Sequence, residues 1–159
     1  LLDQKDAGRI KHLGFSAHGA IPVMERFIDF YGDHLEFCQI QLNYLDWEFQ
    51  DARGKVELCA KHGLPVWVME PVRGGMLANI PSPEVRSILD DASKKDGQPG
   101  ASYASIALRY AEQLDGVLCT LSGMSSPEQM AENIATFSGP VLGANQLAAI
   151  PAPDCAPTS

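Results

Sequence analysis

The stretch FCQIQL at residues 37–42 indicates the fold, because it is mostly apolar, contains residues that favour strands, and is too short for a helix. Similar short apolar runs occur on both sides of it. They are IKHLGF at residues 10–15, PVWVM at residues 65–69 and VLCTL at residues 117–121. Each run has the length of a buried strand, so we predict four strands.

Segments with helical spacing lie between and after these runs. Val23, Phe27 and Phe30 alternate with charged residues and form one apolar stripe of a helix. Helical patterns also occur over residues 56–60, 106–111 and 130–137. A strand followed by a helix, repeated four times, is typical of a parallel β/α arrangement. The segment at residues 80–100 is more polar and contains Pro and Gly, so we expect a short extra helix and a loop there.

The chain length allows only part of a closed barrel. A barrel of eight β/α units needs ~250 residues, whereas this chain has 159. We therefore predict an α/β fold of the (β/α)8 TIM-barrel type with about four units, a half barrel over residues 1–144. The Ala- and Pro-rich residues 145–159 are expected to be a flexible tail. Four strands alone leave two unpaired edges, so either another half precedes Leu1 or two copies pair. The absence of an initial Met favours a longer chain.

The charge of the chain argues against two classes of partner. Twelve Lys and Arg stand against twenty Asp and Glu, which gives a net charge of −8. Such a chain repels nucleic acid and anionic membrane surfaces. No uncharged segment reaches the ~20 apolar residues of a membrane span, and no secretory signal is visible. The four cysteines are widely spaced, so we expect reduced thiols, a cytoplasmic location and no metal site.

Four blocks of the sequence, in order, closely resemble the C-terminal half of the aldo-keto reductases. They are GRIKHLGFSAHG (residues 8–19), QIQLNYLDWEFQ (39–50), WVMEPVRGGMLA (67–78) and LSGMSSPEQMAENI (121–134). This family consists of (β/α)8 barrels that transfer a hydride between NAD(P)H and carbonyl compounds, and the blocks match barrel strands five to eight. The residues of these blocks are most similar to those of the branch whose longer members carry a C-terminal iron–sulfur segment. A cluster of that kind would lie beyond Ser159.

The resemblance implies a nicotinamide site on the first two strands. Ser16 follows the first strand and Gln39 lies on the next, and together a hydroxyl and an amide could hold a carboxamide. In the family, the matching Ser and Gln hold the carboxamide of nicotinamide. The Asn that usually follows the Ser is Ala17 here. Met69 matches a position where many members stack an aromatic ring on nicotinamide. A thioether can cover the same face less specifically, and Met69 could equally be a core residue.

The Gly-rich loop after the third strand is predicted to bind the pyrophosphate. Gly74 and Gly75 allow backbone amides to approach an anion closely, and Arg73 adds a positive charge nearby. By resemblance, Pro71 and the rest of the MEPVRGG loop lie along the pyrophosphate of the cofactor.

The start of the last predicted helix is expected to hold the adenosine end. Ser126 and Gln129 read as a capping box with Pro127 at the first helical position. A helix start collects unpaired N–H groups and partial positive charge. The resemblance assigns adenosine binding to the positions Gly123, Met124, Ser125, Gln129, Glu132 and Asn133. No Lys or Arg follows Thr120, so NADH is a plausible cofactor alongside the NADPH that the family usually prefers.

The catalytic residues of the family have no counterpart in this sequence. The resemblance places its Tyr, Lys, Asp and His on strands one to four, so we assign no catalytic residue. Tyr44, Asp46, Lys61 and His62 are interpreted as surface or capping residues. We predict the cofactor-binding half of an NAD(P)H-dependent oxidoreductase acting on small carbonyl substrates, inactive alone. The alternatives are a non-catalytic half barrel that associates with itself and, less favoured, a metal-dependent barrel enzyme.

Overall fold

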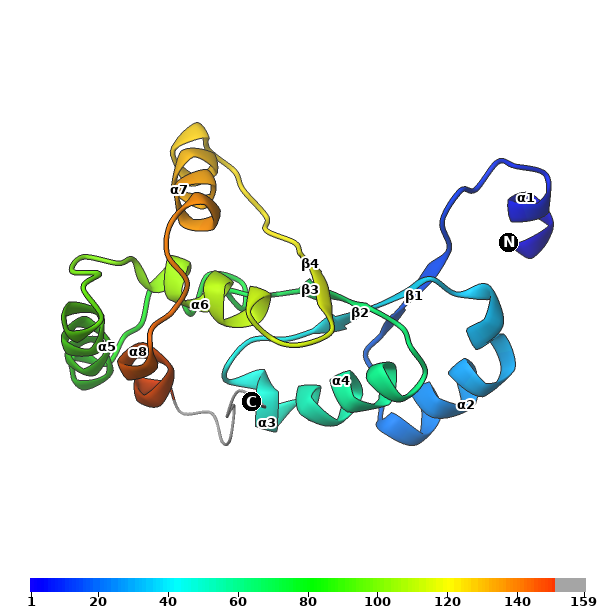
Figure 1. Ribbon diagram of the computed structural model, residues 1–159, viewed down its shortest axis with the longest axis horizontal. Coiled ribbons are helices and arrows are strands. Elements are labelled where there is room, and N and C mark those ends of the chain that lie inside the picture. Colours follow the sequence, from blue (N-terminus) through cyan, green and yellow to red (C-terminus); the bar gives the residue numbers. More distant parts are fainter. Residues whose placement is uncertain (151–159) are drawn as a thin grey trace.

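Four parallel strands lie side by side in chain order at the centre of the fold (Figure 1). The computed structural model describes residues 1–150. The strands are β1 (Gly14–Ala17), β2 (Phe37–Gln41), β3 (Val66–Met69) and β4 (Val117–Thr120). All four predicted strands are confirmed, although β1 begins four residues later than predicted, because the chain pairs with β2 only from Gly14 onward.

Helices connect and follow the strands. They are α1 (Leu2–Asp6), α2 (Ile21–Tyr31), the 3-10 turn η1 (Gly32–His34), α3 (Asp46–Phe49), α4 (Ala52–Lys61), α5 (Pro83–Lys95), α6 (Tyr103–Glu112), α7 (Pro127–Ser138) and α8 (Ala144–Ala149). The four predicted helices are confirmed as α2, α4, α6 and α7, and the extra helix expected in residues 80–100 is α5. No helix among the described residues is both long and apolar enough to cross a membrane.

The two faces of the sheet differ in burial. On one face, Cys38 and Ile40 of β2 are fully buried, and they pack with side chains from α2 and α4. On the other face, which we call the open face, Phe37 and Gln39 are only half-buried. Phe37 stacks on Trp67 of β3 with ring centroids 4.0 Å apart. The Phe37 ring lies over Gly14 so closely that a Cβ there would come within 2.5 Å of it. Among the described residues, these side chains of the open face are therefore only partly covered.

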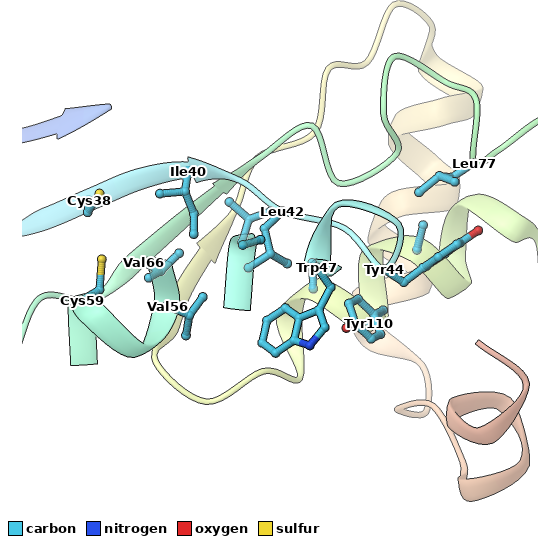
Figure 2. Close-up of a cluster of buried hydrophobic side chains, with 14 of the residues drawn as sticks. Cys38, Ile40, Leu42, Tyr44, Trp47, Val56, Cys59, Val66, Leu77 and Tyr110 are labelled. Carbon is cyan, nitrogen blue, oxygen red and sulfur yellow. The ribbon is translucent and has the colours of Figure 1, made fainter. Parts of the chain in front are cut away.

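The core lies between the sheet and the helices (Figure 2). Tyr110 of α6 meets the rings of Tyr44 and Trp47 edge to face, at 5.9 and 6.4 Å between centroids. Cys38 of β2 faces Cys59 of α4, and a hydrogen bond between the thiols together with burial raises the pKa of Cys38. Both cysteines are free thiols, as expected.

The packed part of the chain extends to Ile150, so the predicted tail begins too early. Helix α8 packs against α5, and Gln146 is fully buried. Its Nε2 donates to Ser93 Oγ at 3.1 Å, and its backbone amide donates to Asp96 Oδ2 at 2.7 Å. The prediction missed α8 because a buried, hydrogen-bonded Gln leaves no apolar pattern in the sequence. Residues 151–159 of the predicted tail lie outside the described residues.

Candidate functional site

A pocket of about 440 Å³ opens where β3 and β4 end. Its size lies in the ordinary range for small-molecule sites, ~300–1,000 Å³. Nine of the thirteen residues predicted from the sequence to bind the cofactor line it. These are Met69, Pro71, Gly74, Gly75, Gly123, Met124, Gln129, Glu132 and Asn133. The other four, namely Ser16, Gln39, Arg73 and Ser125, lie outside its lining.

One wall of the pocket is the loop after β3, which has an unusual backbone. Glu70, Arg73, Gly74 and Gly75 all have positive φ, at 58°, 49°, 61° and 90°. This left-handed conformation suits glycine but is rare for other residues. The backbone amide of Gly75 donates to the Val72 carbonyl at 3.0 Å, so it is not bare as the sequence suggested. The amide of Gly74 donates to the carboxylate of Glu70 at 2.6 Å.

Arg73 points toward a buried acid. Its Nε lies 3.5 Å from Asp46 Oδ2, and its guanidinium lies 5.5 Å from the centre of the Phe49 ring. Asp46 is fully buried and also accepts hydrogen bonds from Gln41 and Asn43, at 2.8 and 2.7 Å. The positive charge expected beside the Gly-rich loop is thus paired with Asp46.

The opposite wall of the pocket is the start of α7. Ser126 Oγ accepts from the amide of Gln129 at 3.3 Å, which confirms the predicted N-cap. The Gln129 side chain accepts from the amide of Ser125 at 2.7 Å, one residue before the position that a capping box requires. Hydrogen bonds from its own backbone amide and from Ser126 lower the pKa of Glu128. This helix end therefore favours negative charge and hydrogen-bond acceptors.

Asn133 adds a further polar group to the same wall. Its Nδ2 donates to Ser122 Oγ at 2.8 Å, across the turn between β4 and α7. Helix α7 has no buried residue and stands apart from the sheet at the end of two connecting segments (Figure 1). The bond between Asn133 and Ser122 therefore helps to fix the distance between the helix and the strand.

Ser16 and Gln39 lie on the open face beside the pocket. They are direct neighbours in the register of β1 and β2, so their side chains project from the same face of the sheet. Gln39 Nε2 lies 3.5 Å from the Sδ of Met69, which lines the pocket. The hydroxyl, the amide and the thioether thus form a row that leads into the pocket. His18 lines a separate hollow with residues of α3 and α4.

Two residues interpreted as surface or capping groups are in fact buried. Tyr44 is 5% exposed and Asp46 is fully buried, because the segment after β2 turns back into the core. Burial raises the pKa of Tyr44 to about 12. That direction is the wrong one for a proton donor near neutral pH, which supports assigning no catalytic role to it.

The contacts of two residues that shape the site were not predicted from the sequence. Glu70 holds the amide of Gly74, and Arg109 of α6 donates to the backbone carbonyls of Thr136 and Gly139 at the end of α7. An acidic residue directly after a strand could have indicated the first. Nothing in the local pattern indicates the second. Among residues 1–150, no group of three or more His, Cys, Asp or Glu side chains is placed to hold a metal ion.

Comparison with known proteins identifies the architecture. The model of the aldo/keto reductase family matches residues 1–153. The structure is similar to a thermostable aldo-keto reductase solved with the inhibitor epalrestat, at 18% identity and a TM-score of 0.71, covering 93% of this chain and 50% of that one. It is also similar to the holo form of the aldo-keto reductase AKR11C1 from Bacillus halodurans, at 24% identity and a TM-score of 0.68, covering 94% and 52%. No curated protein matches the chain.

The chain matches only part of each solved structure, as expected for a half barrel. The chain spans about half the length of both structures. Together with the four-stranded parallel sheet, this confirms the predicted half barrel.

Proposed function

Because this chain belongs to the aldo/keto reductase family, we propose that it forms the cofactor-binding half of an oxidoreductase that transfers a hydride between a nicotinamide dinucleotide and a small carbonyl compound. One observation carries this proposal. Nine residues assigned to the cofactor from the sequence, in the two segments 69–75 and 123–133, line one pocket at the carboxyl ends of the strands. Barrel enzymes gather their ligand groups at this end.

The groups in and beside the pocket suit the parts of a dinucleotide. The start of α7, with Gln129 and Asn133, offers polar groups and a helix N-terminus to the adenosine end. The loop at Gly74, which lines the pocket, would lie along the pyrophosphate. The row formed by Met69, Gln39 and Ser16 would hold the nicotinamide and its carboxamide. The bound dinucleotide would supply the hydride.

Neither Tyr44 nor Lys61 is suited to donate the proton that completes a carbonyl reduction. Tyr44 is buried with a raised pKa, and Lys61 is exposed and paired with Glu25 at 3.0 Å. We propose that the donor lies outside this sequence and that the chain alone does not turn over. Its own residues would bind and orient the cofactor.

The cofactor that we propose is NADH in preference to NADPH. A 2′-phosphate is held in proteins by Arg or Lys side chains. Residues 121–150 contain neither, and Arg109 is engaged by the end of α7 and by Glu112. Glu132, which lines the pocket, would repel the added phosphate.

Isothermal titration calorimetry with the purified chain tests the proposal. We expect binding of NADH, weaker binding of NADPH, and no oxidation of NADH when an aldehyde is added. The Gly123→Trp variant fills the adenosine end of the pocket, and its binding should be strongly reduced. If neither dinucleotide binds the chain, or if the chain alone reduces the aldehyde, the proposal fails.

A second candidate function, a half barrel that associates with a second copy of itself, is favoured by the exposure of apolar side chains. Phe37 and Trp67 lie on the open face, while Met130 and Ile134 of α7 are 52% and 62% exposed. Large exposed apolar surfaces mark interaction sites. Size-exclusion chromatography with light scattering distinguishes the candidates, since a monomer at micromolar concentration would exclude this one.

A further inference from the structure

Glu70 occupies a special place at the end of β3. Its backbone has a φ of 58°, and its carbonyl accepts from Nδ2 of the fully buried Asn43 at 2.9 Å. The backbone of Glu70 is therefore fixed. Its side chain is exposed and turns toward Gly74, where Oε2 lies 2.6 Å from the amide nitrogen.

The loop has few amides to offer to a ligand. The amides of residue 73 and of residues 75–79 donate to backbone carbonyls at 3.0 to 3.2 Å. The amide of Gly74 differs, because a side chain holds it. A side chain can rotate away without breaking the fold of the loop, so the amide of Gly74 is an exchangeable donor at this wall of the pocket.

Among residues 1–150, no ion pair joins Glu70 to a Lys, Arg or His side chain. Arg73, three residues further on, pairs with Asp46. A short hydrogen bond from a backbone amide to a carboxylate is of the strong, charge-assisted kind. One N–H cannot serve two anions at full strength, and at this short distance the carboxylate repels a second anion. A phosphate oxygen that approaches Gly74 must therefore displace Glu70.

We propose that Glu70 is an internal competitor that sets the affinity of this pocket for anionic, pyrophosphate-containing ligands. The inference rests on the proposed function, because it concerns the same pocket. In this role, Glu70 lowers the affinity of the pocket for the dinucleotide. In the free protein the Glu70 carboxylate accepts the hydrogen bond from the Gly74 amide. When the ligand binds, a phosphate oxygen takes its place.

Calorimetry with three ligands tests this role. The wild-type chain, Glu70→Gln and Glu70→Ala are each titrated with NADH, ADP and adenosine. Glu70→Gln keeps the shape and one acceptor but removes the charge, so it preserves the loop. We expect both variants to bind NADH and ADP about tenfold more tightly than the wild type. The affinity for adenosine, which has no phosphate, should stay unchanged. Glu57→Gln, on the exposed surface of α4, makes the same change in net charge and should have no effect.

The outcomes separate the inference from the proposed function. If the wild type binds NADH and the Glu70 variants bind it equally or less well, Glu70 only braces the loop and the inference is wrong, while the proposed function stands. Equal tightening for adenosine also overturns the inference, because it would not depend on the phosphates. If no protein of the set binds NADH or ADP, both the inference and the proposed function fail.

Discussion

The Nη2 of Arg109 in α6 donates to the carbonyl oxygen of Gly139 at 2.6 Å and thereby ties α6 to the residue that ends α7. The same nitrogen donates to the carbonyl of Thr136, and Nη1 pairs with Glu112 at 2.9 Å. Arg109 is 5% exposed. A buried cation at a helix C-terminus satisfies carbonyls that the helix leaves unpaired. Since α7 buries no residue of its own, this arginine is a main anchor of one wall of the pocket.

Replacing Arg109 should therefore loosen the wall. We expect Arg109→Met, which keeps an unbranched but shorter and uncharged side chain, to lower the free energy of unfolding by about 2–3 kcal/mol. NADH binding should weaken as well. Urea unfolding measures the first effect. Arg86→Met serves as the control, because Arg86 makes one long bond of 3.4 Å to the Ile80 carbonyl. Equal unfolding midpoints in the two variants would contradict the anchoring role.

The nicotinamide end can be tested separately through Gln39. In Gln39→Leu the amide is lost at nearly constant volume, and the hydrogen bond to Met69 Sδ is replaced by an apolar contact. Losing one hydrogen bond should weaken NADH binding roughly fivefold. ADP lacks the nicotinamide, so its affinity provides the control in the same variant. A parallel loss for ADP would show that the substitution disturbs the whole pocket.

Cofactor preference should respond to the charge of Glu132. The Glu132→Arg variant places a guanidinium on the pocket wall, where it can pair with a 2′-phosphate. We expect the ratio of NADPH to NADH affinity to rise about tenfold or more. Glu57→Arg makes the same change in charge on α4 and should leave the ratio as it is. An unchanged ratio in Glu132→Arg would place the 2′ position elsewhere.

The stability of the chain in acid should depend on Glu36. This carboxylate lies 2.6 Å from Lys5 and 2.6 Å from His12, and the hydrogen bonds from these two residues lower its pKa from the ordinary 4.5 to about 2. The folded state thus favours the ionised form. The stabilisation is present above pH 4.5 and is lost as the pH falls from 4.5 towards 2.

Urea unfolding at a series of pH values measures this contribution. The wild-type midpoint should fall through this range more steeply than that of Glu36→Gln, which cannot titrate there. Parallel curves would mean that the contacts of Glu36 do not survive in solution.

The sequence was sufficient to predict the strands and the long helices. Runs such as FCQIQL at residues 37–42 combine burial on one face with a strand's length, and both properties are local. Short helices were missed, because α3 and α8 contain too few turns to show a period. Gln146 shows the limit most clearly, since its burial depends on Ser93 and Asp96, which are distant in the sequence.

The sequence indicated where most residues of the candidate site lie, but not which contacts they make. Met69 and Gln129, which were assigned to the site by resemblance to the family, both line one pocket. The directions of Arg73 and Glu70 were not predictable, because each depends on a side-chain rotation and on a distant partner. Asp46 attracts Arg73 only once the segment after β2 has folded back into the core.

The stacked pair of Phe37 and Trp67 also gives the molecule an optical reporter. The chain contains two tryptophans. Trp47 is already buried in the core at 7% exposure, whereas Trp67 is half-buried on the open face. Whatever covers that face, another part of a longer chain or a second copy, must dehydrate Trp67 and leave Trp47 unchanged. A blue shift of the indole emission would then report closure of the barrel without any label.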